Sequence, residues 1–298
     1  MRKELLTYLS PKSPISEIFR TLRTNIQFMN AKGNLKTILV TSILPGEGKS
    51  WVSSNLAVTF AQAGKRVILV DSDMRKGRQY SIFGVSPRPG LSNYLSGMDD
   101  SYNPTSTNDF TKYIQKTEVE NLYLISAGNV PPNPSELLVS ERMASLINGL
   151  KEMADIVIFD GPPSQLVTDS LIITRFVDTT VIVSASKMSK KDDLKKLIGN
   201  IRNVGGRIAG VVVNKVPMSA KKYEDAYYYG STTMAVSKKS QKKTAPTSKP
   251  NNEFEKPKSN EIIDNSKDIN LEDTQEMIRK IKEYVDIEKM NLNYDKRG

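Results

Sequence analysis

The sequence contains no cysteine and no histidine among its 298 residues. Disulfides, zinc sites, thiol nucleophiles and imidazole acid–base catalysis are therefore excluded, so any chemistry must depend on Asp, Lys, Arg, Ser or Tyr. No apolar run approaches the roughly 20 residues that a membrane-spanning helix needs. No signal peptide is recognisable, and together with the missing cysteines this favours a cytoplasmic protein.

Basic residues outnumber acidic ones, with 43 Lys and Arg against 33 Asp and Glu, which gives a formal net charge of +10. This excess suggests an anionic partner such as a nucleotide, a nucleic acid or an acidic lipid. The alternative is that the positive charge only keeps the protein soluble. A lysine cluster at 238–243 is compatible with an anionic membrane surface, and equally with a solvated charge run.

A glycine-rich loop at 43–50, Ile-Leu-Pro-Gly-Glu-Gly-Lys-Ser, separates an apolar run from a helical stretch. In such a loop the backbone N–H groups at 46–48 point at phosphate oxygens, Lys49 adds a positive charge, and Ser50 offers a hydroxyl ligand for Mg²⁺. The strict pattern requires Gly where this chain has Ile43. A plain glycine-rich turn is the alternative, but the order strand, loop, helix favours binding of a nucleoside triphosphate.

Three aspartates follow apolar runs of strand length. Asp71 and Asp73 come directly after one such run and share a face, because residues two apart in a strand point to the same side. Asp160 ends another run. Ligands of open α/β sheets bind at the carboxyl ends of the strands. A single aspartate there is more often a helix cap or turn former, but three of them beside a phosphate loop indicate a nucleotide and metal site.

Strand-length apolar runs alternate with helical stretches between residues 35 and 216, as in βαβ units. We therefore predict an α/β fold, a P-loop NTPase-like parallel sheet with helices on both faces, and a polar surface loop at 101–116. The expected strands are 35–41, 66–70, 122–126, 155–159, 179–184 and 206–213. The expected helices are 49–62, 134–151, 169–176 and 190–204.

Segments on both sides of the sheet carry further patterns. A predicted helix at 14–29 has charged residues at a spacing of three, which alone indicates only an exposed charged face: Glu17, Arg20 and Arg23. After the sheet, four tyrosines stand among charged residues without an apolar partner face, so we expect an exposed tyrosine segment: Tyr223, Tyr227, Tyr228 and Tyr229. Polar composition then predicts a disordered linker, followed by an amphipathic helix near 271–290.

Together these motifs resemble the bacterial protein-tyrosine kinases of capsular and exopolysaccharide assembly. The likeness spans roughly residues 12–230. Its motifs are, in chain order, Glu17-x-x-Arg20-x-x-Arg23, Pro45 to Ser50, Asp71-x-Asp73-x-Arg75, Pro-Pro-Asn-Pro-Ser-Glu-Leu-Leu at 131–138, Asp160-Gly-Pro-Pro, Asn214-Lys215 and the tyrosine segment. The resemblance implies four parts: an N-terminal segment with an oligomerisation helix (1–33), a P-loop kinase domain (34–218), the tyrosine cluster (219–230), and a linker with a short C-terminal helix (231–298). In the family the tyrosine cluster usually ends the chain, whereas residues 231–298 follow it here.

The resemblance implies an ATP- and Mg²⁺-dependent tyrosine kinase of the separate cytoplasmic subunit type, which phosphorylates its own tyrosine cluster in trans within a ring of like subunits. The helix at 14–29 would make the ring contact through Glu17, Arg20 and Arg23. The implied partners are a membrane-spanning modulator of the polysaccharide co-polymerase type and other tyrosine-containing proteins, with no nucleic acid. The implied location is the inner face of the plasma membrane, reached through the modulator.

The resemblance also implies a role for each site residue. The nucleotide would be held by Pro45, Gly46, Glu47, Gly48, Lys49, Ser50 and Trp51, with Asn214 at the adenine. Mg²⁺ would be positioned by Ser50 with Asp73 or Asp160. Asp71 would accept or orient the phenol proton, which leaves unassisted only near pH 10. Arg75 would stabilise charge on the transferring phosphoryl group. The division of roles between Asp71 and Asp73 stays open at this level.

Two other functions remain as alternatives. A partitioning or septum-placing ATPase of the same fold would act as a switch that binds DNA or membrane. Such proteins carry a signature lysine early in the loop, where this chain has Leu44, and the tyrosine segment has no role in them. A nucleotide-binding scaffold with vestigial kinase activity is the third possibility, but the retained Lys49 and three aspartates favour an active kinase.

Overall fold

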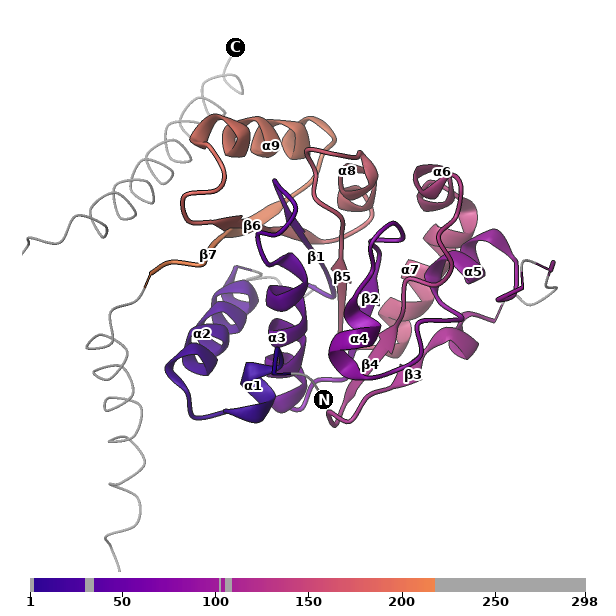
Figure 1. The fold of residues 1–298 in the computed structure, drawn as a ribbon, viewed down its shortest axis with the longest axis horizontal. Coiled ribbons are helices and arrows are strands. Elements are labelled where there is room, and N and C mark those ends of the chain that lie inside the picture. The colour runs from indigo at the N-terminus through magenta and orange to yellow at the C-terminus, as the bar shows by residue number, and fades with distance from the viewer. Residues whose placement is uncertain (1–2, 30–34, 102, 105–108, 218–298) are drawn as a thin grey trace, which may run out of the picture. The chain divides into compact units, whose positions relative to one another are not determined.

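The computed structural model describes residues 3–29, 35–101, 103–104 and 109–217, which form a sheet with helices on both faces (Figure 1). Its strands are β1 (Thr37–Ser42), β2 (Val67–Asp71), β3 (Gln115–Lys116), β4 (Leu122–Ile125), β5 (Ile156–Asp160), β6 (Thr179–Ala185) and β7 (Ile208–Asn214). Its helices are α1 (Leu6–Leu9), α2 (Pro14–Phe28), α3 (Lys49–Gln62), α4 (Gln79–Phe83), α5 (Leu91–Ser96), the 3₁₀ helix η1 (Phe110–Tyr113), α6 (Pro134–Leu138), α7 (Glu141–Met153), α8 (Asp169–Thr174) and α9 (Lys191–Asn203).

The seven strands lie in the order β3-β4-β2-β5-β1-β6-β7. Every pairing is parallel except that of β3 with β4, so the predicted parallel sheet is confirmed with one antiparallel edge strand. After β1 the chain moves to β2 on one side and later to β6 on the other, which makes β1 the point where the strand order reverses. In open α/β sheets such a point is where ligands bind, at the carboxyl edge.

Alternate residues of the buried strands pack into two apolar cores, one on each face of the sheet. In β1, Ile38 and Val40 join the core under α1 to α4, whereas Leu39 joins the core under α5, α7 and α8. The predicted helix at 14–29 is confirmed as α2. Its Phe19 and Ile26 are buried in the first core, so α2 packs against the domain and only its other face carries the exposed charges.

Two sequence predictions of local structure are wrong. The single helix expected at 134–151 is two helices, because the extended Ser140 starts α7 and its Oγ accepts the N–H of Met143 at 3.3 Å. Serine is favoured at this capping position, where it satisfies a free N–H of the first turn. The loop expected at 101–116 contains η1 and β3 near its end, and Tyr113 is buried against Tyr94.

The tyrosine segment at 219–230, the predicted linker and the predicted helix at 271–290 lie outside the described residues. Among the helices in the part of the chain that the structure describes, none has the length and apolar character needed to cross a bilayer.

Candidate active site

The loop between β1 and α3 has a shape that only glycine allows at its last turn. Gly48 has a φ of 95°, in the left-handed region that favours glycine, and directly precedes α3. The side-chain amide of Asn214, at the end of β7, donates to the carbonyl of Glu47 at 2.8 Å, and a Cβ on Gly48 would collide with that amide. The first N–H groups of α3 have no acceptor inside the helix, so this helix end suits a phosphate.

The buried side chain of Glu47 fixes the conformation of this loop through hydrogen bonds. Its side chain is fully buried, and Oε2 accepts the N–H groups of Ile43 at 2.8 Å and Leu44 at 2.7 Å. Its Oε1 accepts the N–H of Ala185 at 3.0 Å and the hydroxyl of Ser189. The carboxylate therefore ties the loop to the end of β6, while only the backbone of Glu47 is left for a phosphate.

Ile43, the departure from the strict loop pattern, has a structural explanation. Its side chain is 2% exposed and belongs to the buried apolar residues of the domain. The loop thus begins with an apolar anchor whose N–H is held by Glu47, so the conformation does not depend on a glycine at this position.

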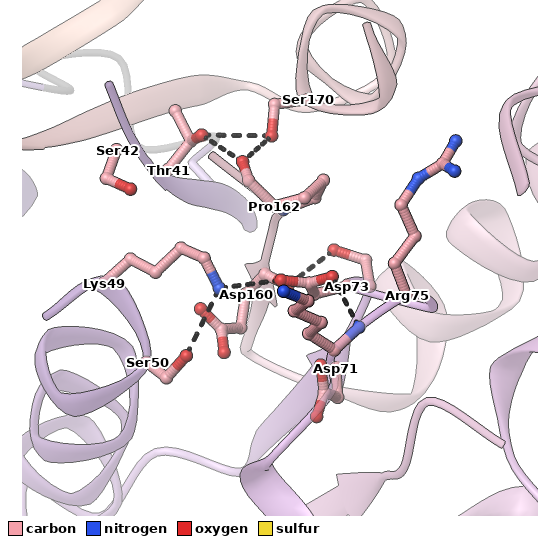
Figure 2. Close-up of polar contacts among 12 residues, drawn as sticks. Thr41, Ser42, Lys49, Ser50, Asp71, Asp73, Arg75, Asp160, Pro162 and Ser170 are labelled. Carbon is pink, nitrogen blue, oxygen red and sulfur yellow. Dashed lines mark hydrogen bonds and ion pairs between the residues drawn. The ribbon is translucent and has the colours of Figure 1, made fainter. Parts of the chain in front are cut away.

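Lys49 and Asp73 form an ion pair beside the loop, with Nζ and Oδ2 2.9 Å apart (Figure 2). The Lys49 Nζ also lies 3.4 Å from the hydroxyl oxygen of Ser50. Burial opposes the charge on Lys49, but the carboxylates of Asp160, Asp73 and Asp71 outweigh this effect and raise its pKa. Lys49 therefore holds a full positive charge at the position where the loop would present phosphates.

Asp71 and Asp160 end β2 and β5 at paired register positions, and both side chains are fully buried. Gln79, the first residue of α4, contacts both of them. Its backbone N–H donates to Asp71 Oδ2 at 2.9 Å, and its Nε2 donates to Asp160 Oδ2 at 2.7 Å. The same Nε2 lies 3.0 Å from the carbonyl oxygen of Ser50. A single glutamine thus fixes both carboxylates relative to the first turn of α3.

The remaining oxygens of this pair, Asp71 Oδ1 and Asp160 Oδ1, are buried and accept no hydrogen bond within the described ranges. Burial, followed by the repulsion of Asp160, raises the pKa of Asp71 to about 8. A buried acceptor without a donor costs roughly 1–3 kcal/mol, which a bound cation or proton would relieve.

This donor set fits Mg²⁺, which takes oxygen ligands and is usually held by one or two carboxylates together with substrate phosphates and water. No three acidic side chains converge into a complete metal cage in the described part of the chain. A site that relies on phosphate oxygens does not need such a cage.

Comparisons with known proteins place this chain in a family. Residues 35–211 match the family model described as an AAA domain. The putative tyrosine-protein kinase CapB of Staphylococcus aureus is 41% identical over 226 residues, which cover 76% of this chain and 95% of that protein. This chain belongs to the bacterial tyrosine kinases of capsular and exopolysaccharide assembly.

Solved structures agree with this tyrosine kinase assignment. The kinase domain of the Escherichia coli tyrosine kinase ETK matches with a TM-score of 0.67 and 32% identity, over 72% of this chain and 81% of that one. The septum site-determining protein MinD from Pyrococcus horikoshii, complexed with Mg-ADP, matches with a TM-score of 0.50 and 20% identity, over 64% of this chain and 77% of that one. The second likeness shows the shared P-loop fold alone. The AAA match implies nucleotide binding, in agreement with the loop geometry.

Arg75 of the kinase lies apart from the other predicted catalytic residues. Its Nε donates to Asp169 Oδ2 at 3.1 Å, and Asp169 Oδ1 accepts the hydroxyl of Ser135 at 2.5 Å. Figure 2 shows the guanidinium directed away from Lys49 and Asp73. The structure therefore brings Lys49, Asp73, Asp71 and Asp160 together and joins Arg75 to α6 through Asp169. Its predicted role at the phosphoryl group stays a prediction.

The outer residues predicted to hold nucleotide differ in their surroundings. Pro45 and Gly46 are exposed at the tip of the loop. The Trp51 ring packs edge-on against Phe19 of α2, with ring centroids 5.1 Å apart, so its side chain faces α2. Asn214 bonds to the loop backbone, and its predicted contact with adenine stays a prediction.

The predicted ring-contact residues of α2 divide into two kinds. Glu17 and Arg20 form an ion pair with each other, and Arg20 also donates to the carbonyl of Pro11. Arg23 instead donates from Nη1 to the carbonyl of Thr59 in α3 at 2.7 Å. Arg23 therefore fastens α2 to the domain, whereas the Glu17–Arg20 pair is available on the surface. The interface role of all three stays a prediction.

The buried contacts of the Glu47 and Gln79 side chains were not predicted. Glu47 was predicted as one of the loop residues that hold the nucleotide, and no role was predicted for Gln79. A buried role for either side chain depends on partners far away in the sequence, as with Glu47 and Ala185, which are 138 positions apart.

Proposed function

We propose that this kinase transfers the γ-phosphoryl group of ATP, in an Mg²⁺-dependent reaction, to tyrosines of the segment 219–230 in a second copy of the chain. The observation that carries the proposal is the position of the Lys49–Asp73 pair beside Asp71 and Asp160 at the mouth of the phosphate loop. Family membership supports the reaction type, and this cluster supports its location.

The phosphate loop would hold the nucleotide. The backbone N–H groups from Gly46 to Trp51 would donate to the β- and γ-phosphate oxygens, with Pro45 at the outer tip of the loop. Lys49 would exchange part of its contact with Asp73 for a phosphate oxygen, because the phosphate carries more charge. Asn214 would place the adenine beside the end of β7.

The metal would be held by Ser50 Oγ with Asp73 or Asp160, and the remaining ligands would be phosphate oxygens and water. Bound Mg²⁺ supplies charge neutralisation on the β- and γ-phosphates. The free buried oxygen of Asp160 supports its place in this set.

The acceptor tyrosine would lose its proton to Asp71, whose raised pKa makes it a better base than an ordinary aspartate. The phenol oxygen forms a bond to the γ-phosphorus as the bond from that phosphorus to the bridging oxygen breaks, and ADP leaves. Asp71 has a free buried oxygen, whereas both oxygens of Asp73 have partners: Lys49 at 2.9 Å and the N–H of Lys76 at 3.0 Å. This difference favours Asp71 as the base. Arg75 would break its contact with Asp169 and stabilise the negative charge on the phosphoryl group during transfer.

The proposal extends to the domain organisation of the chain, its assembly into a ring and its location at the membrane. The chain would act as a P-loop kinase domain (34–218) with an oligomerisation helix in 1–33, acceptor tyrosines in 219–230, and a linker with a short helix in 231–298. A ring of copies in contact through Glu17, Arg20 and Arg23 would bring each tyrosine segment to a neighbour. A membrane-spanning modulator of the polysaccharide co-polymerase type would hold the ring at the inner membrane face, where it regulates capsular or exopolysaccharide synthesis and export and phosphorylates other proteins.

Mass spectrometry of the full chain after incubation with Mg-ATP and the cytoplasmic segment of its modulator tests the proposal. We expect phosphate on Tyr223, Tyr227, Tyr228 or Tyr229, and none in Lys49→Met. Lys65→Met, which removes an exposed lysine, is the matched control and should behave as the parent. Labelling that persists in Lys49→Met, or that falls only on Ser and Thr, would reject the kinase assignment at this site.

Transfer between copies has its own test. Lys49→Met chains retain acceptor tyrosines, and chains with phenylalanine at the four tyrosines retain the catalytic cluster. Mixing the two should place phosphate on the Lys49→Met chains. Absence of phosphate in the mixture, when the parent is labelled, would show transfer within one chain.

A further inference from the structure

The side-chain amide of Asn214 lies against the phosphate loop and is hydrogen-bonded at both of its ends. Its Nδ2 donates to the carbonyl oxygen of Glu47 at 2.8 Å, and its Oδ1 accepts the N–H of Lys215 at 2.8 Å. A carbonyl requires a donor and an N–H requires an acceptor, so the two partners together fix which end of the amide faces the loop. The amide of Asn214 is therefore already oriented in the protein without nucleotide.

The backbone around Asn214 holds this side chain in place. Lys215 has a φ of 56°, in the left-handed region that few residues other than glycine adopt. Such a conformation persists only where its surroundings hold it, and the bond from its N–H to Asn214 Oδ1 is one such contact. The carbonyl of Asn214 also accepts the N–H of Ser186 at 2.8 Å, which joins the end of β7 to the residue after β6.

Glu47 is bonded to both of these strand ends. Its carboxylate accepts the N–H of Ala185, the last residue of β6, at 3.0 Å, and its main-chain carbonyl accepts the amide of Asn214, the last residue of β7. Ala185 and Asn214 are register partners in the sheet. The carboxylate fixes the position of the loop, whereas the bond to the carbonyl acts on the peptide unit that joins Glu47 to Gly48.

The peptide bond between Glu47 and Gly48 converts this contact into a direction for a donor. The bond is trans, since the cis peptide bond in the described part of the chain is that of Arg88 and Pro89. In a planar trans peptide the C=O and N–H groups point to opposite sides. Because Asn214 holds the carbonyl, the N–H of Gly48 points away from the Asn214 amide. That N–H donates to no acceptor among the residues that the structure describes.

Glycine alone does not select this orientation of the peptide unit. Gly48 has a φ of 95°, and glycine adopts positive and negative φ about equally readily. Within the described ranges the Glu47 carbonyl accepts no hydrogen bond other than that from Asn214. A Cβ on Gly48 would lie 2.1 Å from Asn214 Nδ2, so the amide fits closely against the Cα of Gly48. Asn214 is therefore the contact that selects the direction of the Gly48 N–H.

We propose that Asn214 is a positioning residue for the triphosphate, which directs the Gly48 N–H at a phosphate oxygen whether or not a base is bound. This role is separate from the adenine contact predicted for the same residue, because the amide nitrogen has a second hydrogen. The inference rests on the proposed binding of the triphosphate by the loop. It predicts that loss of the amide weakens ligands that have phosphates and no base.

Inorganic tripolyphosphate tests this role, because it has a chain of three phosphates and no base. Titration calorimetry with Mg²⁺ present gives the Kd of tripolyphosphate and of ATP for the parent full chain and for Asn214→Ala. The substitution changes no charge, so a loss of affinity cannot come from charge repulsion. Asn203→Ala, at an exposed asparagine that ends α9, is the matched control.

We expect Asn214→Ala to weaken tripolyphosphate binding about threefold to tenfold, the loss typical of one neutral hydrogen bond. When only a fraction of the molecules presents the Gly48 N–H correctly, the apparent Kd rises by the inverse of that fraction. ATP should lose at least the same factor, and a larger factor for ATP would support the predicted base contact as well. Asn203→Ala should bind both ligands as the parent does.

Amide hydrogen exchange without ligand tests the same contact in the free protein. The N–H groups of Ile43 and Leu44 are bonded to Glu47, so exchange of the segment 43–50 reports the order of the loop. Asn214→Ala should accelerate exchange of this segment by at least about threefold, while β1 and β5 keep the rates of the parent. This pattern separates a local change in the loop from a general loss of stability.

Unchanged tripolyphosphate affinity beside weaker ATP binding would overturn the inference and leave Asn214 as a base contact alone. Equal exchange of the segment 43–50 in Asn214→Ala and Asn203→Ala, or a uniform rise over the whole domain, would also overturn it. If both measurements come out as expected but the parent with Mg-ATP and its modulator gives no phosphotyrosine, the proposed function fails alone. If phosphotyrosine forms and depends on Lys49 while Asn214→Ala binds tripolyphosphate as the parent does, this inference fails alone.

Discussion

Replacing Glu47 by glutamine tests whether a buried carboxylate builds the phosphate loop before nucleotide arrives. In the parent, the two oxygens of Glu47 accept four hydrogen bonds, from the N–H groups of Ile43, Leu44 and Ala185 and from the hydroxyl of Ser189. Glutamine keeps the shape but replaces one oxygen by an NH₂ group. That group would take the place of Oε1, where the hydroxyl of Ser189 can turn to accept from it but the N–H of Ala185 cannot. One contact would therefore be lost, and the other three would no longer involve a charged group.

The expected cost follows from these contacts. A hydrogen bond to a charged group contributes about 1.5–3 kcal/mol and a neutral one about 0.5–1.5 kcal/mol, so losing one and making three neutral should destabilise the domain by about 3 kcal/mol or more. For a domain of this size, each kcal/mol lowers Tm by about 2–4 °C, which predicts a decrease of about 6–12 °C. The affinity for ATP should fall as well, because the N–H groups that bind phosphate are held in place by the same loop.

Differential scanning calorimetry of Glu47→Gln without nucleotide measures the first effect, and titration calorimetry with ATP measures the second. Glu120→Gln is the matched control, since Glu120 is exposed, and its Tm should equal that of the parent. A Tm for Glu47→Gln within about 2 °C of the control, with unchanged ATP affinity, would refute the view that this carboxylate shapes the loop.

Three further predictions concern the cluster and α2. Because the pKa of Asp71 is raised to about 8, its ionisation opposes folding as the pH rises. Without metal or nucleotide, the free energy of unfolding of Asp71→Asn minus that of the parent should therefore increase between about pH 4 and pH 8. The increase should reach several kcal/mol, at about 1.4 kcal/mol per pKa unit. A difference that stays constant with pH would contradict this. Gln79→Leu should raise the Mg²⁺ concentration needed for ATP binding, because the Asp160 carboxylate loses its donor; an unchanged Mg²⁺ titration would count against the positioning role of this glutamine. Arg23→Ala should lower stability by about 1 kcal/mol through loss of its bond to α3, whereas Arg20→Ala should not, so equal denaturation midpoints would contradict the structural distinction.

The sheet and the phosphate loop could be predicted because their signals are local. The strands are unbroken apolar runs, and α3 begins at the predicted Lys49 because a glycine in the left-handed region directly precedes it. Asp71 and Asp160 could be assigned to one edge because parallel strands place their carboxyl ends together. The division of the segment 134–151 was not predicted, although Ser140 is a residue type that is favoured at helix starts.

The contacts that organise the site could not be predicted, because each joins residues far apart in the chain. Gln79 reaches Asp160 across 81 positions, and nothing around Gln79 distinguishes it from a surface polar residue. The partner of Arg75 is similarly remote, since Asp169 lies 94 positions away. The cavity between α5, α6 and the loop after β4 likewise depends on separate segments that meet only in the folded domain.

A crystal structure of the full chain with Mg²⁺ and a non-hydrolysable ATP analogue would show directly where the triphosphate and the metal bind. We expect the β- and γ-phosphates on the N–H groups of the loop from Gly46 to Ser50 and Lys49 Nζ on a phosphate oxygen. We expect the metal between Ser50, the phosphates and the carboxylates of Asp73 or Asp160. Triphosphate bound elsewhere, or a metal remote from all three aspartates, would contradict these expectations.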